Sequence, residues 1–269
     1  MVTALRHDPP AWAPLAFGAL ARAAVRSGRS PDHAVVELEA LLRQRFDAER
    51  VILFGSGTQA LAAAIRAARK AAGGDRPVAL PAFNCYDIAA AAIAADAPVL
   101  LYDIDPDTLG PDWASLRAAL TAGAGAVVLA SLYGYPIDWE RATGLASGHG
   151  AILIEDAAQG SGGTWQGRAL GSFGDLSVLS FGRGKGWTGG GGGALLLRHP
   201  DVHVPAPMPP GRGRGIRVAT LAGAQWLLSN PRLYGVPAAM PWLHLGETVY
   251  HPLLVTAGIS PFSAALLLE

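Results

Sequence analysis

The stretch Ala151-Ile152-Leu153-Ile154-Glu155-Asp156-Ala157-Ala158-Gln159 decides the fold. It begins with a short apolar run and ends in two acidic residues and a polar segment. Such a short, uniformly apolar run is typical of a strand that is buried on both faces, as in a parallel sheet. The acidic residues then fall at the carboxyl end of the strand, where open α/β sheets bind their ligands. We therefore expect a central strand at 151–155 and a ligand site at its end.

The same alternation of apolar runs and alanine-rich segments continues on both sides of this strand. Further strands are expected at 50–54, 78–81, 99–102, 126–130, 176–181 and 193–197, with helices at 57–72, 86–95, 113–120 and 139–149. Strands that alternate with helices imply a mostly parallel sheet covered by helices on both faces. The sequence thus predicts a three-layer α/β/α fold.

Three regions differ in character along the chain. Residues 1–48 form an N-terminal helical segment, in which Ser30-Pro31 has the pattern of a helix start. Residues 49–204 form the α/β domain that carries every chemical motif. Residues 205–269 begin with a proline- and glycine-rich linker, continue with a helix at 218–228, and end in another helical segment.

Composition excludes several classes of protein. Of 269 residues, 51% are hydrophobic and 16% are charged, which is typical of a folded protein and not of a disordered one. Lys+Arg and Asp+Glu are both 21, so bulk charge favours neither a nucleic-acid partner nor a membrane surface. Cys85 is the only cysteine, which fits the cytoplasm. We expect no signal peptide and no membrane span, because Asp96 and Pro98 break the longest apolar run.

The first chemical motif is Phe54-Gly55-Ser56-Gly57-Thr58, between a strand and a helix. Small residues let a ligand approach the backbone, and free amides at a helix start favour an anion such as phosphate. A tight turn in which Ser56 caps the helix explains the same residues. Gly55-x-Gly57-x-x-Ala60 also matches a dinucleotide fingerprint, but Asp75 precedes the second strand where the fingerprint needs an acid at that strand's end.

Two further motifs follow later strands. The acids Glu155 and Asp156 could face the ligand crevice, although an acid at a strand end is often a helix cap or an ion-pair partner. Lys185 stands in the glycine-rich loop 182–193, which fails the phosphate-loop pattern because Gly186 occupies the Ser/Thr position. A lysine in such a loop is either a solvated charge or a desolvated amine that forms an imine.

Taken together, six segments resemble the sugar aminotransferase family DegT/DnrJ/EryC1/StrS, whose members are fold-type I pyridoxal-phosphate enzymes. They are Ser56-Gly57-Thr58-Gln59-Ala60-Leu61, Leu80-Pro81-Ala82-Phe83-Asn84-Cys85, Asp103-Ile104-Asp105-Pro106-Asp107-Thr108, Leu132-Tyr133-Gly134-Tyr135-Pro136, Glu155-Asp156-Ala157-Ala158-Gln159, and Ser180-Phe181 with Lys185. Each segment is weak alone, but their shared order and spacing make the resemblance specific.

The resemblance implies pyridoxal 5'-phosphate as cofactor and a role for each motif residue. Lys185 would hold the cofactor covalently and shuttle the proton. Asp156 would pair with the pyridine nitrogen, and Gln159 would lie near the ring hydroxyl. The phosphate would be bound by the turn and by the strand that precedes Lys185, through Ser56, Gly57, Thr58 and Ser180. No metal site is expected.

The resemblance also implies a reaction and partners. An amino acid, with glutamate expected, would give its amino group to a keto sugar that is attached to a nucleotide, and the protein would be a homodimer in the cytoplasm. Lys185 favours transamination over the sugar dehydration of a sister group, which has histidine at that position. The small C-terminal domain of the family is expected to be missing or truncated after 258–265, so an inactive, cofactor-binding remnant is the alternative.

Several positions depart from the family pattern. Cys85 stands where an aromatic residue often stacks on the cofactor, with Tyr86 next to it, so the stacking residue stays unassigned. Cys85 has two interpretations, a small buried residue or a reactive thiol. Ser131 replaces a common histidine, and we expect it to affect the substrate side. Arg183 is either a substrate contact or a solvated charge.

Overall fold

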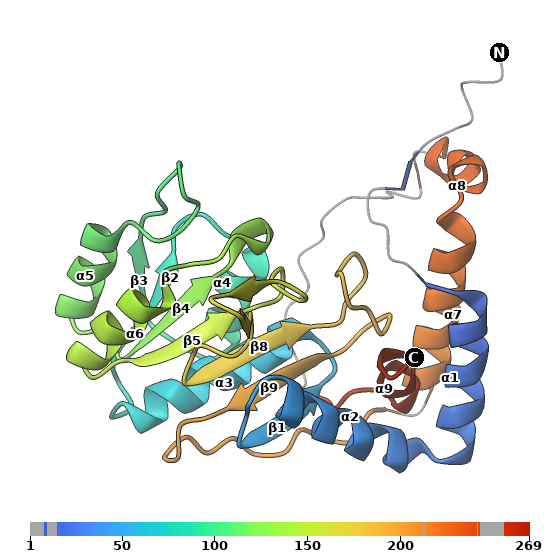
Figure 1. The fold of residues 1–269 in the computed structure, drawn as a ribbon, viewed down its shortest axis with the longest axis horizontal. Coiled ribbons are helices and arrows are strands. Elements are labelled where there is room, and N and C mark those ends of the chain that lie inside the picture. Colours follow the sequence, from blue (N-terminus) through green and yellow to red (C-terminus); the bar gives the residue numbers. More distant parts are fainter. Residues whose placement is uncertain (1–7, 10–14, 212, 241, 243–255) are drawn as a thin grey trace.

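The structure is a computed structural model, and it describes residues 8–9, 15–211, 213–240, 242 and 256–269. The described elements follow the order helix, helix, then alternating strands and helices, then helices (Figure 1). They are α1 (Phe17–Arg29), α2 (Pro31–Arg45), β1 (Arg50–Phe54), α3 (Gly57–Ala71), β2 (Val78–Pro81), α4 (Tyr86–Ala94), β3 (Val99–Tyr102), α5 (Trp113–Thr121), β4 (Ala126–Ala130), η2 (Leu132–Gly134), α6 (Trp139–Gly148), β5 (Ile152–Asp156), β6 (Thr164–Trp165), β7 (Arg168–Ala169), β8 (Leu176–Ser180), β9 (Gly193–Leu197), α7 (Arg214–Leu228), α8 (Pro231–Ala238) and α9 (Pro261–Leu267).

The main sheet has seven strands in the order β1-β9-β8-β5-β4-β2-β3. Strands β8, β5, β4, β2 and β3 pair in parallel, whereas β9 pairs antiparallel with both β8 and β1. Strand β1 therefore runs in the same direction as β8, and six of the seven strands end at one edge. The prediction of a mostly parallel sheet is confirmed.

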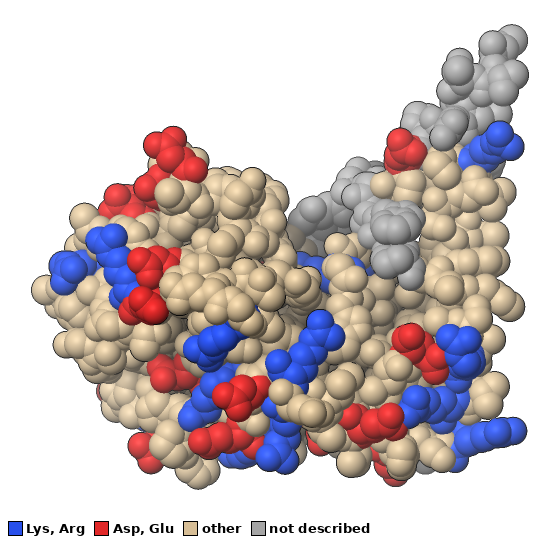
Figure 2. All heavy atoms as spheres, in the orientation of Figure 1, with Lys and Arg blue, Asp and Glu red and all other residues tan. Residues whose placement is uncertain are grey.

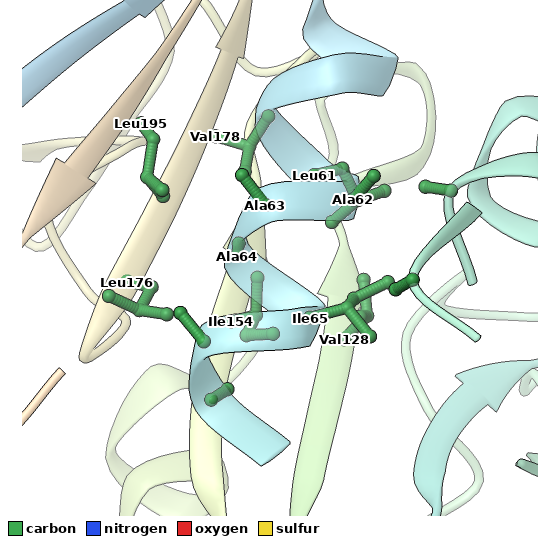
Figure 3. Close-up of a cluster of buried hydrophobic side chains, with 14 of the residues drawn as sticks. Leu61, Ala62, Ala63, Ala64, Ile65, Val128, Ile154, Leu176, Val178 and Leu195 are labelled. Atoms are coloured by element: carbon green, nitrogen blue, oxygen red, sulfur yellow. The ribbon is translucent and has the colours of Figure 1, made fainter. Parts of the chain in front are cut away.

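Side chains on alternate strand residues enter different cores, which produces the three layers. On β4 and β5, Val128 and Ile154 pack in the cluster that contains α3 and α4, and Val127 and Leu153 pack in the cluster that contains α5 and α6. Figure 3 shows the first cluster, in which Ile65 of α3 lies against these strands. Strands of this kind have no polar face, which is why they appear in the sequence as continuous apolar runs.

The N-terminal helices and the last helix pack together beside the β1 end of the sheet. Leu38 of α2, Leu196 of β9, and Phe262 of α9 belong to one buried cluster. Helix α2 begins at Pro31, and α9 begins after Ser260, whose hydroxyl accepts a hydrogen bond from the Ser263 amide. The helix start predicted at Ser30-Pro31 is therefore present, and the chain segments before and after the α/β region share one core.

A few local features differ from the expected boundaries. Strand β5 runs one residue further than predicted, so that Asp156 is its last residue. The short hairpin of β6 and β7 and the 3-10 turn η2 were not expected, because neither has an apolar period.

Acidic and basic side chains lie interspersed on the face seen in Figure 2. Among the described residues, no helix has the length and apolar character needed to cross a membrane.

Candidate active site

One open cavity lies at the edge of the sheet where the parallel strands end. It holds about 570 Å³ of space that atoms do not fill, part of it open to solvent. Its walls come from the α3 and α4 starts and from the ends of β4, β5 and β8, and the lining residues are Gly57, Thr58, Leu61, Cys85, Asp87, Ile88, Ala130, Ser131, Leu132, Asp156, Ala158, Gln159, Val178, Ser180 and Lys185.

The structure brings six of the seven predicted site residues to this cavity. Those six are Gly57, Thr58, Asp156, Gln159, Ser180 and Lys185. The seventh, Ser56, is not among the lining residues, and its hydroxyl accepts a hydrogen bond from the Gln59 amide at 3.2 Å. Ser56 is therefore placed as the N-cap of α3, which is the alternative that the sequence left open.

The turn between β1 and α3 can approach β8 only because it carries no side chain at Gly57. A Cβ built on Gly57 would lie 2.7 Å from the Ser180 Cβ and 2.9 Å from its Oγ. Gly193, at the start of β9, also allows the turn to come close, since a Cβ built on it would lie 2.5 Å from the Gly57 nitrogen. The first amides of α3 and the Ser180 hydroxyl thus meet at one point, and this is a suitable arrangement for an anion.

Asp156 presents a carboxylate from the last position of β5. Its Oδ1 accepts a hydrogen bond from the Ala158 amide at 3.0 Å, which fixes the side chain against its own backbone. Burial raises the pKa of the Asp156 carboxyl, and the Ala158 amide and the Lys185 ammonium oppose that rise. Lys185 and Asp156 are therefore close enough to interact electrostatically, and both line the same cavity.

Glu155 belongs to the structure of the sheet and not to the cavity. Its side chain is fully buried, and its carboxylate accepts hydrogen bonds from the Gly171 and Phe173 amides at 2.6 and 2.8 Å. The Ser177 hydroxyl donates a third bond at 2.9 Å and itself accepts one from Arg198. Burial raises the pKa of Glu155, and these donors oppose it. Adjacent strand residues face opposite sides, so only one of the two acids can reach the ligand.

Lys185 lies in the loop from β8 to β9, which is held by Thr188. The buried Thr188 hydroxyl bonds to the Gly182 carbonyl at 3.1 Å and accepts the Gly190 amide at 3.1 Å. The Lys185 amide bonds to the Gly182 carbonyl at 3.3 Å, which closes a turn around Gly184 at φ +80°. These contacts hold a half-buried lysine at the cavity wall instead of leaving it as a solvated charge.

Gln159 is held by the loop that follows β4. Its Oε1 accepts a hydrogen bond from the Tyr133 amide at 2.7 Å, so its side-chain NH₂ is left to donate elsewhere. Tyr133 has φ +53° in the turn η2, a backbone conformation that is uncommon for a residue with a side chain. The strained turn therefore serves to fix a cavity residue.

The start of α4 supplies cavity residues that were not assigned by the sequence. Cys85 lines the cavity, whereas Tyr86, which is 41% exposed, is not among the lining residues. Asp87 also lines it and was not predicted. Its position in the first turn of a helix, after a strand end, is the signal that could have indicated it. Arg183, the other open assignment, is exposed and does not line the cavity.

The structure is incompatible with the dinucleotide fingerprint. That fingerprint requires a first strand that pairs in parallel with the strand after its helix. Strand β1 instead lies at the edge of the sheet and pairs antiparallel with β9, far from β2 in the strand order. No cluster of three metal-ligating side chains occurs within the described part of the chain.

The three-layer fold is that of the large domain of fold-type I pyridoxal-phosphate-dependent transferases. Residues 19–213 match the DegT/DnrJ/EryC1/StrS aminotransferase family. The chain belongs to this family, as its motifs predicted.

Two curated relatives are aminotransferases that are named after different substrates. The chain is 34% identical over 210 residues to an L-glutamine:2-deoxy-scyllo-inosose aminotransferase from Streptomyces kanamyceticus, covering 74% of this chain and 48% of the relative. It is also 34% identical over 142 residues to a UDP-N-acetyl-3-dehydro-alpha-D-glucosamine 3-aminotransferase from Acidithiobacillus ferrooxidans, covering 53% and 38%. The chain thus spans about half the length of the first of these relatives and less than half the length of the second.

Solved structures share the fold over nearly the whole chain. AtS13 from Actinomadura melliaura has a TM-score of 0.69 at 26% identity, covering 98% of this chain and 66% of that chain. The sugar aminotransferase CalS13 from Micromonospora echinospora has a TM-score of 0.66 at 23% identity, covering 97% and 67%. Spr1654 from Streptococcus pneumoniae, in its PLP-form, has a TM-score of 0.69 at 20% identity, covering 97% and 66%.

Proposed function

We propose that this chain binds pyridoxal 5'-phosphate covalently at Lys185 and transfers an amino group from an amino acid, glutamate or glutamine, to the ketone of a hydroxylated ring. The ring would be a keto sugar, attached to a nucleotide, or a cyclitol. The proposal includes a homodimer that works in the cytoplasm. It draws on family membership for the reaction and on the cavity for the residues.

The donor set of the cavity fits this cofactor at each of its polar ends. The α3 amides at Gly57 and Thr58 and the Ser180 hydroxyl form a cradle for the phosphate. The Asp156 carboxylate would hold a proton on the pyridine nitrogen. The amine of Lys185 would bond to the aldehyde carbon. This match of three separate groups to one molecule supports the assignment better than any one of them alone.

When bound, pyridoxal 5'-phosphate supplies a protonated ring that withdraws electrons from the carbon next to the amino group. The chain contributes position and proton transfer. Asp156 carries the counter-charge that keeps the ring nitrogen protonated, and the Ala158 amide keeps its carboxylate oriented. The Lys185 amine, once released from the aldehyde carbon, would take the proton from the donor amino acid and return it during the second half of the reaction.

The observation that carries the proposal is that Lys185 and Asp156 line one cavity beside the anion cradle. The chain offers a sharp test, because Lys70 and Lys185 are its only lysines. We expect added pyridoxal 5'-phosphate, after reduction with borohydride, to label Lys185 and add the mass of one cofactor. Lys70, exposed on α3, provides the matched control as Lys70→Arg, which should label fully.

The Lys185→Ala variant should give no labelled peptide, and labelling that persists on Lys70 or the N-terminus would overturn the proposal. Conversion of the bound cofactor to its amine form by glutamate or glutamine then tests the reaction itself. Labelling without that conversion would favour the alternative, a protein that binds the cofactor without turnover. Sedimentation of the labelled chain would measure its oligomeric state.

A further inference from the structure

Ser131 carries a buried hydroxyl that has no partner. The residue is 1% exposed, and its Oγ makes no hydrogen bond in the part of the chain that the structure describes. A buried hydroxyl without a partner is costly, and such groups in native proteins usually await a water or a ligand. Ser131 lines the candidate active-site cavity.

Three other buried polar atoms among the described residues share this lack of a partner. They are Trp139 Nε1, Ser161 Oγ and Gln225 Nε2. None of these three residues lines the cavity. Among the four, only Ser131 has a buried hydroxyl without a partner and also belongs to the cavity lining. Ser161 offers the same chemical group outside the cavity, and it is therefore a natural control.

The strand order places Ser131 on the side of the cavity away from the anion cradle. Ser131 directly follows β4, and its amide donates to the Asp156 carbonyl at 3.4 Å. Two residues later comes Tyr133, whose amide donates a hydrogen bond to the Gln159 side chain. The cradle instead comes from β1 and β8, and β5 separates β4 from β8. Ser131 thus belongs with Asp156 and Gln159.

The constitution of the cofactor leaves one acceptor on that side. Two edges of the pyridine ring lead from the nitrogen to the carbon that carries the aldehyde. One edge carries the phosphate arm, and the other carries a methyl group and a hydroxyl oxygen. Only the oxygen can accept a hydrogen bond. Because Asp156 is assigned to the ring nitrogen, the neighbouring Ser131 hydroxyl has this oxygen as its available partner.

We propose that the Ser131 hydroxyl donates a hydrogen bond to the ring oxygen of pyridoxal 5'-phosphate, beside the side-chain NH₂ of Gln159. This inference rests on the proposed function and refines the sequence-based expectation, which assigned Ser131 to the substrate side. The hydroxyl is a neutral donor, so it stabilises negative charge on the ring oxygen without adding a positive charge of its own. Ser131 is then a cofactor-contacting residue that tunes how readily the oxygen takes up a proton.

The test uses the purified full chain and pyridoxal 5'-phosphate, with absorbance and affinity as readouts in place of activity. In Ser131→Ala, the loss of the donor should weaken cofactor binding about tenfold and raise the pH midpoint of the absorbance change of the bound cofactor by about one unit. Ser131→Thr, which keeps the hydroxyl, should restore both values towards those of the unchanged chain. Ser161→Ala should alter neither.

Two further measurements separate a contact with the ring oxygen from a structural effect. The dissociation constant of inorganic phosphate should be the same for the unchanged chain and for Ser131→Ala, because the cradle lies on the other side. A cofactor analogue with hydrogen in place of the ring hydroxyl should bind both chains equally. Unfolding in urea without cofactor should show Ser131→Ala to be no less stable, since no bond is lost.

The outcomes distinguish this inference from the proposed function. If the unchanged chain takes up no pyridoxal 5'-phosphate, both fail together. If it does so and Ser131→Ala gives the same affinity and pH midpoint, only the inference for Ser131 is overturned. A Ser131→Ala chain that loses affinity for inorganic phosphate, or for the analogue, would equally contradict a bond to the ring oxygen.

Discussion

Gly57 and Ser180 lie so close that a Cβ on the glycine would sit 2.7 Å from the Cβ of the serine. We predict that Gly57→Ala forces the turn away from β8, lowers the free energy of unfolding by about 1–3 kcal/mol, and weakens binding of pyridoxal 5'-phosphate. Urea unfolding and a cofactor titration measure the two effects. The control is Gly144→Ala in α6, where a Cβ meets nothing within 4 Å. It should leave affinity unchanged and stabilise the chain slightly.

If Gly57→Ala binds the cofactor as tightly as the unchanged chain does, the turn between β1 and α3 is not the phosphate cradle. A loss of stability without any loss of affinity would then show that the close contact serves packing alone.

Asp156→Asn should trade stability against cofactor affinity. Because burial raises the pKa of the Asp156 carboxyl, its contribution to stability is full at acidic pH and is lost as pH rises through the raised value. The asparagine keeps an oxygen for the Ala158 amide and removes the charge. Without cofactor, we therefore expect Asp156→Asn to be more stable at pH 7 by about 1 kcal/mol.

The difference between the two chains should shrink as pH falls, which is measured by urea unfolding at several pH values. Affinity for pyridoxal 5'-phosphate should fall at pH 7, since the ring nitrogen loses its counter-charge. An asparagine variant that is less stable at neutral pH, or that binds the cofactor with unchanged affinity, would contradict this account of Asp156.

Glu155 should matter for folding and not for the ligand. Glu155→Ala leaves the Gly171 and Phe173 amides and the Ser177 hydroxyl without their acceptor, and Arg198 without its nearby acid. We expect a loss of about 3–5 kcal/mol in the free energy of unfolding, because a broken buried network leaves its other members unpaired.

Glu155→Gln, which keeps one acceptor oxygen, should lose less, and Glu140→Ala on the exposed face of α6 should change stability little. In any Glu155 variant that still folds, affinity for pyridoxal 5'-phosphate should stay close to that of the unchanged chain. A folded Glu155→Gln chain with strongly reduced affinity would show that this acid does reach the ligand.

The sequence predicted the sheet and most of the cavity because both depend on local patterns. Fully buried strands appear as apolar runs, and the residues that follow them must lie at one edge when the strands are parallel. The position of Asp156, Ser180 and Lys185 in one place follows from that rule. The opposite facing of Glu155 and Asp156 was also within reach, since side chains alternate along a strand.

Other features depend on contacts between distant parts of the chain. The reversed strand β9, which separates β1 from β8, gives no local signal, and this strand order is what excludes the dinucleotide fingerprint. The unpaired state of the Ser131 hydroxyl likewise follows from what surrounds it and not from its neighbours in sequence. Asp87 enters the cavity only because α4 starts beside β4 and β5 in space.

Cys85 should report on occupancy of the cavity. It is the only cysteine, its residue is exposed, and it lines the cavity wall. Partial burial raises the pKa of its thiol, while the nearby Lys185 ammonium opposes that rise. Because the thiolate is the reactive form, we expect slow alkylation by iodoacetamide at pH 7, with a rate that increases steeply as pH rises above 8.

Saturating pyridoxal 5'-phosphate should slow this alkylation about tenfold or more, because the cofactor would fill the space in front of the thiol. The chain unfolded in urea provides the reference rate of a free thiol, and it should react faster at pH 7 and show no protection. Mass spectrometry of the Cys85 peptide gives both rates. An equal alkylation rate with and without cofactor, in a chain whose Lys185 is labelled, would mean that Cys85 does not face the bound cofactor, and that the start of α4 contributes no wall to the cofactor site.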